Sequence, residues 1–135
     1  MNIAVIGTGY VGLCSGVGLA EKGHNIVCVG RKKDKIDKIN RGVPPIYEEG
    51  LESLLKKLVS EKRLSATDSF EEAMENAELT FICVGTPCDD NGRIDLTEMN
   101  AAARQVGMVM RKKSYHVVVV KSTVVPGTTE AVAKI

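Results

Sequence analysis

A glycine-rich loop near the N-terminus constrains the fold more than any other feature of the chain. Gly7, Gly9 and Gly12 lie in the string GTGYVG, which matches G-x-G-x-x-G, between an apolar run at residues 3–6 and a helical pattern over residues 11–22. In this context the first glycine permits a tight turn, the second lets the backbone approach a pyrophosphate, and the third allows close helix packing. The sequence therefore predicts a dinucleotide-binding βα unit, with the pyrophosphate on the amides at the N-terminus of the helix.

Apolar runs farther along the chain predict the rest of a sheet. These runs lie at residues 26–29, 64–66, 79–84 and 117–120. They are mostly continuous rather than alternating, which is typical of strands covered on both faces. Helical patterns separate or follow them at residues 34–40, 48–62, 70–76, 97–110 and 128–135, with Asp68 or Ser69 and then Thr97 as expected N-caps. The alternation predicts an α/β fold, a Rossmann-type doubly wound parallel sheet of five or six strands with helices on both faces.

Composition narrows the classes of function. The chain has 135 residues and a net charge of +1, which fits one domain spanning residues 1–135. Trp is absent and aromatic residues make up 4%, so neither charge nor stacking surface favours nucleic-acid binding. No apolar run approaches the ~20 residues of a transmembrane helix, so we expect no membrane partner. The four cysteines are not spaced as metal ligands, so we expect no metal site. We also expect their thiols to be free, as in a cytoplasmic protein.

The end of the second predicted strand lacks a side chain that many dinucleotide sites contain. An acidic residue about 20 positions beyond the glycine loop accepts hydrogen bonds from the adenosine ribose of NAD. Here Gly30 occupies that position, and Arg31 follows it directly. A missing carboxylate removes repulsion toward a 2′-phosphate, and a guanidinium can bind that phosphate or stack on the adenine. These residues therefore leave two cofactors open, NAD and NADP.

Three further motifs accompany the glycine loop. They are PIYEEGL at residues 45–51, FICVGTP at residues 81–87 and VKSTVVPGT at residues 120–128. Together the four motifs resemble the N-terminal NAD-binding domain of the UDP-glucose/GDP-mannose dehydrogenase family, and most of all its UDP-glucose 6-dehydrogenases. The resemblance implies oxidation of UDP-glucose, or a related nucleotide hexose, at C6 to the uronate, with two hydride transfers to NAD.

The same resemblance implies parts that this sequence does not contain. In the family a later domain supplies the nucleotide-sugar pocket and a catalytic cysteine, and the whole enzyme forms a homodimer. The helical pattern at residues 128–135 carries no stop signal, which favours one domain of a longer protein. We therefore expect the 135-residue chain alone to be inactive.

The resemblance also implies roles for residues on the predicted loops. Lys35 and Thr86 match cofactor-contacting residues, and Thr123 matches a catalytic residue beside the nicotinamide that helps to position a water. Both threonines follow parallel strands, at the edge where such sheets bind ligands, and a hydroxyl both donates and accepts hydrogen bonds. The complete expected cofactor-binding set is Gly7, Gly9, Tyr10, Val11, Gly12, Gly30, Arg31, Lys35, Val84, Gly85, Thr86, Pro87, Ser122 and Thr123.

Two other functions stay open from the sequence. A stand-alone domain could bind a dinucleotide and regulate a partner without catalysis, and a 3-hydroxyacid-type dehydrogenase could have a similar cofactor domain. The VGTP and KST motifs favour the nucleotide-sugar enzymes over the second alternative. The substrate itself stays open among UDP-glucose, GDP-mannose and N-acetylated nucleotide hexoses.

Overall fold

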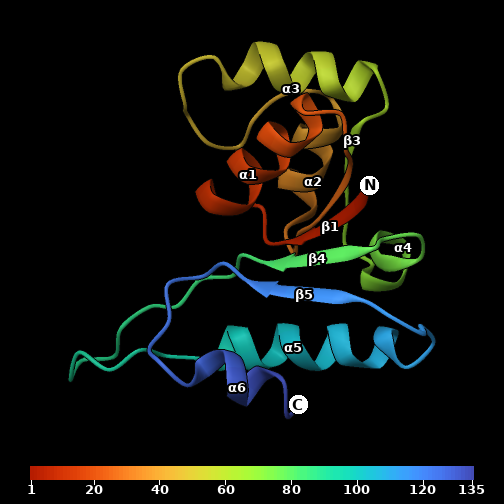
Figure 1. Ribbon diagram of the computed structural model, residues 1–135. Coiled ribbons are helices and arrows are strands. Elements are labelled where there is room, and N and C mark those ends of the chain that lie inside the picture. Colours follow the sequence, from red (N-terminus) through yellow and green to blue (C-terminus); the bar gives the residue numbers. More distant parts are fainter.

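Five parallel strands form a single sheet in the computed structural model, which describes residues 1–135 (Figure 1). The strands are β1 (Asn2–Ile6), β2 (Asn25–Val29), β3 (Leu64–Thr67), β4 (Leu79–Ile82) and β5 (Val117–Val120). Their order is β3-β2-β1-β4-β5, and every neighbouring pair is parallel. The predicted parallel sheet is confirmed. β4 ends at Ile82, two residues earlier than the apolar run at residues 79–84 predicts. Beyond this end, the carbonyl oxygen of Val84 accepts a hydrogen bond from the Ser122 hydroxyl (2.7 Å) instead of one from a neighbouring strand.

Six helices connect or follow the strands. They are α1 (Tyr10–Glu21), α2 (Lys33–Asn40), α3 (Leu51–Ser60), α4 (Phe70–Met74), α5 (Thr97–Met110) and α6 (Thr128–Val132). The helix predicted from residue 48 begins later, because Gly50 has a left-handed backbone with a φ of 78°. A residue in that conformation cannot continue a right-handed helix toward the N-terminus.

Side chains fix the first turns of α4 and α5. The Ser69 hydroxyl caps α4 by accepting a hydrogen bond from the Glu72 amide (3.1 Å), as one of the two expected caps. The expected cap of α5 is wrong. Thr97 lies inside the helix, and its amide donates to the Asp95 carboxylate (2.8 Å), so the carboxylate takes the role that the threonine hydroxyl was expected to have.

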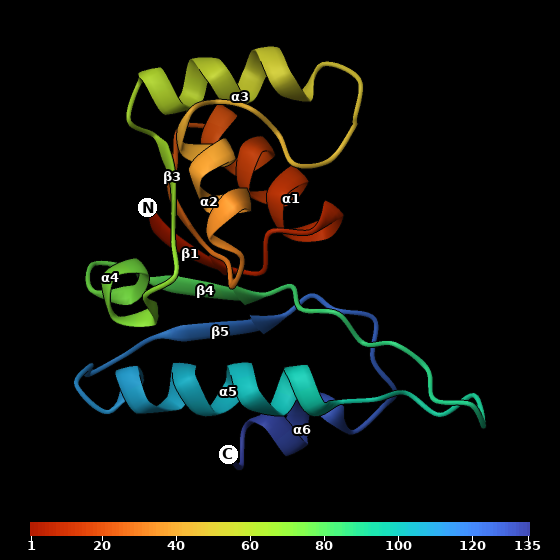
Figure 2. The ribbon, with the colours of Figure 1, turned by 180° about the vertical axis from the view of Figure 1, so that it is seen from behind.

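Helices cover both faces of the sheet (Figure 1 and Figure 2). α1, α2 and α3 lie on one face and share a core with β1, β2 and β3. α4 and α5 lie on the other face against a second core, and α6 packs beside α5. β1 contributes to both, since Ile3 and Val5 enter the first core while Ala4 and Ile6 enter the second. The doubly wound arrangement is therefore confirmed, and the continuously apolar strand is explained by burial on two sides.

The strand order creates a switch point beside β1. β2 and β3 lie to one side of β1, and β4 and β5 lie to the other. At such a point the loops that follow neighbouring strands run to opposite faces, and they leave a crevice at the carboxyl edge of the sheet. After β4 the chain projects beyond the sheet as a long arm (Figure 1). The outgoing and returning segments of this arm are paired by an isolated antiparallel bridge between Cys88 and Ile94.

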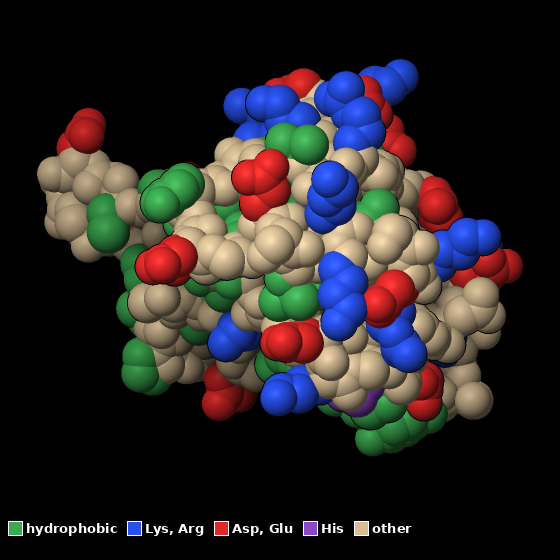
Figure 3. Space-filling model, turned by 90° about the horizontal axis from the view of Figure 1, so that it is seen from above, with side chains coloured by type: hydrophobic (Ala, Val, Ile, Leu, Met, Phe, Trp, Pro, Cys, Tyr) green, Lys and Arg blue, Asp and Glu red, His purple; other side chains and the backbone are tan.

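The surface carries charges of both signs. Lys and Arg side chains are interspersed with Asp and Glu over the face shown in Figure 3. None of the six helices combines the length and the apolar character needed to cross a bilayer.

A half-buried histidine at the start of β5 is sensitive to pH. The Nε2 atom of His116 lies 2.8 Å from the hydroxyl oxygen of Thr80, which is fully buried. Desolvation, and then the nearby Lys113 cation, lower the pKa of His116 below its ordinary value of 6.5. The imidazole therefore takes up its proton at a lower pH in the folded protein than in the unfolded chain, which is protonated as the pH falls through that value.

We expect the melting temperature of the protein to fall between about pH 7.5 and about pH 5.5, because protonation in this window favours the unfolded chain. In the variant His116→Gln, which keeps a polar partner for the Thr80 hydroxyl, the decrease should be smaller. Thermal unfolding followed by circular dichroism at both pH values measures the difference. Equal decreases in the two proteins would show that His116 is not responsible.

Candidate dinucleotide site

Two glycines of the loop after β1 leave no room for a side chain. Gly7 has a φ of 119°, and a Cβ on it would lie 2.4 Å from the carbonyl oxygen of Cys83. A Cβ on Gly12 would lie 2.0 Å from the carbonyl oxygen of Gly7. Both distances are far below van der Waals contact, so only glycine fits at these positions. The tight loop lets α1 begin directly at the carboxyl end of β1.

The middle of the same loop is open and presents unused hydrogen-bond donors. A Cβ on Gly9 would meet no atom within 4 Å. The amides of residues 8–12 donate to no acceptor in the protein, and the first bond into α1 runs from the Leu13 amide to the Gly9 carbonyl oxygen (2.9 Å). The first turn of α1 contains no acidic residue that could occupy these donors. Free amides at a helix N-terminus, with open space beside them, suit a phosphate group.

Tyr10 and Val11 project from the first turn of α1, and both are about half exposed. The Tyr10 hydroxyl donates to the Tyr47 carbonyl oxygen (3.2 Å). This bond places the PIYEEGL segment, which lies between α2 and α3, beside the glycine loop.

The end of β2 contains no acid, and buried neighbours fill the adjacent space. A Cβ on Gly30 would lie 3.0 Å from Cγ2 of Thr8 and 3.3 Å from Cγ1 of Ile36. Arg31 projects into solvent, and its guanidinium forms an ion pair with Glu98 in the first turn of α5. The strand end is therefore cationic, but that cation has a carboxylate partner.

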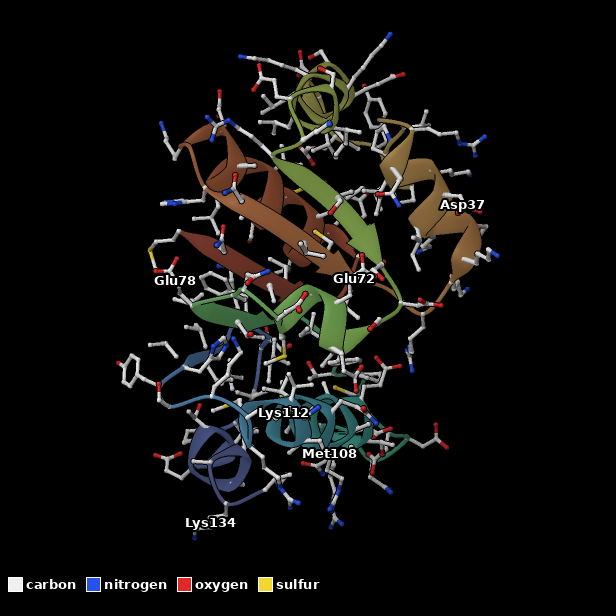
Figure 4. The ribbon with its side chains drawn as sticks, turned by 90° about the vertical axis from the view of Figure 1, so that its right-hand side faces the viewer. Asp37, Glu72, Glu78, Met108, Lys112 and Lys134 are labelled. Carbon is white, nitrogen blue, oxygen red and sulfur yellow. The ribbon has the colours of Figure 1, made fainter.

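α2 carries the other charges near this strand end. Lys35 is half-buried in its first turn. Asp34 and Asp37 are exposed, and Figure 4 labels Asp37 on α2. Neither carboxylate forms an ion pair with a Lys or Arg side chain. The acids of α2 therefore do not engage Arg31.

The loops after β4 and β5 meet at the same edge of the sheet. The Thr86 hydroxyl donates to the Thr123 carbonyl oxygen (2.8 Å), although the two residues are 37 positions apart. The Ser122 hydroxyl ties the base of these loops through its bond to Val84. The Thr123 side chain is exposed. The loop after β4 begins with Val84, Gly85, Thr86 and Pro87, so the VGTP and KST motifs are direct neighbours.

Three of the four cysteines are poor nucleophiles because burial disfavours their thiolates. Burial raises the pKa of the Cys28 thiol to about 12 and that of Cys83 to about 11. Desolvation also raises the pKa of Cys14. All four cysteines are free thiols. No cluster of three or more His, Cys, Asp or Glu side chains could hold a metal ion.

Two residues at this edge, Thr8 and Glu98, were not predicted from the sequence. Thr8, which lies against Gly30, occupies a position of the glycine motif that can be any residue, and Glu98 lies 67 positions from its partner Arg31. Short sequence patterns do not reveal contacts of this kind. The strand order could have supplied a signal, because it places α5, which follows β4, across β1 from the end of β2.

The carboxyl edge thus offers three kinds of contact. The free amides suit a pyrophosphate, the end of β2 presents the Arg31 cation with its Glu98 partner, and the hydroxyls of the two later loops suit polar groups beyond β4. These donors and spaces fit a dinucleotide that lies across the end of β1.

Known proteins resemble the chain over its whole length. The NAD binding domain of the UDP-glucose/GDP-mannose dehydrogenase family matches residues 1–135. UDP-glucose 6-dehydrogenase of Bacillus subtilis is 42% identical and GDP-mannose 6-dehydrogenase of Pseudomonas aeruginosa 45% identical, each over 98% of the chain. The chain spans 30% of the length of each relative. The chain is also similar to a crystal structure of a ternary complex of GDP-mannose dehydrogenase from Pseudomonas aeruginosa, with 44% sequence identity and a TM-score of 0.94. The alignment covers 98% of the chain described here and 30% of the chain in that crystal structure.

Proposed function

Because the chain belongs to the UDP-glucose/GDP-mannose dehydrogenase family, we propose that residues 1–135 are the dinucleotide-binding domain of a nucleotide-sugar 6-dehydrogenase. In this proposal the whole enzyme oxidises UDP-glucose, or a related nucleotide hexose, at C6 to the uronate. The free amides of residues 8–12 beside the open Gly9 carry the proposal, since they supply what a pyrophosphate needs. The two relatives, a UDP-glucose and a GDP-mannose 6-dehydrogenase, support the reaction class.

The glycine loop, Lys35, Thr86 and Thr123 receive roles in the proposal. The chemistry that the bound cofactor supplies is hydride acceptance. The glycine-loop amides hold the pyrophosphate, with Tyr10 and Val11 beside them, and Lys35 and Thr86 make further contacts to the cofactor. Thr123, whose backbone carbonyl oxygen accepts the Thr86 hydroxyl and whose side chain is exposed, positions a water near the nicotinamide. We assign the substrate pocket and the nucleophilic cysteine to a further domain, since the chain spans 30% of its relatives.

NAD is the cofactor in this proposal, and NADP is the alternative. The matched family domain is described as NAD binding, which supports the first. Gly30 and Arg31 support the second, because no carboxylate follows β2 directly and a cation does.

The proposal also includes the location and the assembly of the whole enzyme, which we infer to be a cytoplasmic homodimer. The free thiols are compatible with a reducing compartment. The substrate that the enzyme binds is a nucleotide sugar, held by the further domain.

Calorimetric titration of the 135-residue chain with NADH, and separately with NADPH, tests the cofactor site. We expect saturable binding of one NADH per chain. We expect no NADH formation from UDP-glucose and NAD by this chain alone, because the substrate pocket is assigned elsewhere. Failure to bind either dinucleotide would contradict the site, and UDP-glucose-dependent NADH formation would contradict the assignment of catalysis to a further domain.

A further inference from the structure

An ion pair crosses the proposed dinucleotide site. Arg31 follows β2, Glu98 lies in the first turn of α5, and β1 with its glycine loop lies between β2 and β4. The Glu98 carboxylate also lies against the segment after β4, since a Cβ on Gly85 would be 3.4 Å from its Oε2 atom. The pair therefore joins the two halves of the sheet at the edge where the cofactor is proposed to bind.

The two partners are held to different degrees. The side chain of Arg31 is 80% exposed, whereas that of Glu98 is 36% exposed. Arg31 extends from a strand end into solvent, so its guanidinium can swing toward a ligand. Glu98 projects from a helix of 14 residues and rests beside Gly85. Its carboxylate is therefore the more fixed charge of the pair.

The position that commonly carries an acid is crowded here. A Cβ on Gly30 would lie 3.0 Å from Cγ2 and 3.1 Å from Oγ1 of Thr8, and 3.3 Å from Cγ1 of Ile36. Both neighbours are buried, so neither can turn away into solvent. A carboxylate at the ribose end of the site must therefore come from another element, and Glu98 is the acid that pairs with Arg31.

We propose that Glu98 is a specificity-determining residue, which replaces the acid missing after β2 and makes the site prefer NAD(H) to NADP(H). This inference rests on the proposed dinucleotide function. The Glu98 carboxylate repels a 2′-phosphate directly, and it keeps the Arg31 guanidinium from binding that phosphate. NAD carries a hydroxyl in place of the phosphate, which neither effect penalises.

Titration of four proteins with NADH and NADPH tests this role: wild type, Glu98→Gln, Arg31→Ala and the double variant. Glutamine keeps the size and polarity of the side chain but removes its charge. We expect Glu98→Gln to tighten NADPH binding about tenfold and to change NADH binding less than about threefold. Arg31→Ala should remove most of this gain in the double variant, because the released guanidinium is the group that binds the phosphate.

Glu52→Gln serves as the matched control, since it neutralises an exposed acid in the first turn of α3. The ratio of the NADPH and NADH dissociation constants should be unchanged in this variant. Binding of neither dinucleotide by the wild type would overturn the proposed function itself. If both bind, an equal ratio in wild type and Glu98→Gln, or an equal gain in the control, would overturn the role of Glu98 alone.

Discussion

Gly7→Ala should lower the free energy of unfolding by about 3 kcal/mol, the sum of two costs. The alanine would have to hold a φ of 119°, and its methyl group would start 2.4 Å from the carbonyl oxygen of Cys83. That oxygen cannot withdraw freely, because the Cys83 amide is bonded to the Ile6 carbonyl oxygen (2.8 Å) at the junction of β1 and β4. Urea unfolding followed by circular dichroism measures the loss as a lower midpoint.

Gly18→Ala is the matched control for this prediction. It makes the same chemical change inside α1, where a Cβ would meet no atom within 4 Å. Alanine is the better helix former, so this variant should gain up to about 1 kcal/mol. A wild-type midpoint for Gly7→Ala, or an equal loss in both variants, would contradict the steric explanation.

Gly9→Ala should weaken NADH binding at least about tenfold, which corresponds to about 1.4 kcal/mol. The added methyl group would meet no protein atom, so it would stand in the open space beside the free amides of residues 8–12. The backbone of Gly9 has a φ of −83°, which alanine adopts without strain, so the free energy of unfolding should change by less than about 1 kcal/mol. Calorimetry and urea unfolding of the same preparation separate the two effects.

The Gly18→Ala variant serves again here, because it should bind NADH as the wild type does. Unchanged NADH affinity in Gly9→Ala would show that the pyrophosphate does not approach this part of the loop. Gly7 and Gly9 would then differ only in their effects on folding.

The fold was largely predictable because its signals are local. Each buried strand appears as a short apolar run, and the run at Val117–Val120 has the same bounds as β5. Element ends were less predictable, because they depend on single backbone angles or on side-chain bonds. Gly50 delays α3 through its left-handed φ, and Asp95 replaces Thr97 at the start of α5.

The candidate site was predictable where its residues follow one another in the chain or, like Thr86 and Thr123, follow parallel strands. The glycine loop and the VGTP segment are continuous, and the motifs identify them directly. The contact of Arg31 with Glu98 depends on the order of strands in space, which no short pattern encodes. The role that we infer for Glu98 therefore needed the structure.

Because Thr8 lies against Gly30, the effect of a substitution at position 30 depends on which residue occupies position 8. Gly30→Asp would be disfavoured while Thr8 is present, because the new side chain would press on atoms 3.0 Å and 3.1 Å away. After Thr8→Ala those two atoms are gone and only Cγ1 of Ile36, 3.3 Å away, still crowds the new Cβ, so the same acid would be less disfavoured. The order of mutations therefore matters for a lineage, or for an engineer, that would restore a carboxylate at the end of β2. An acid at position 30 is more readily accepted after the change at position 8 than before it.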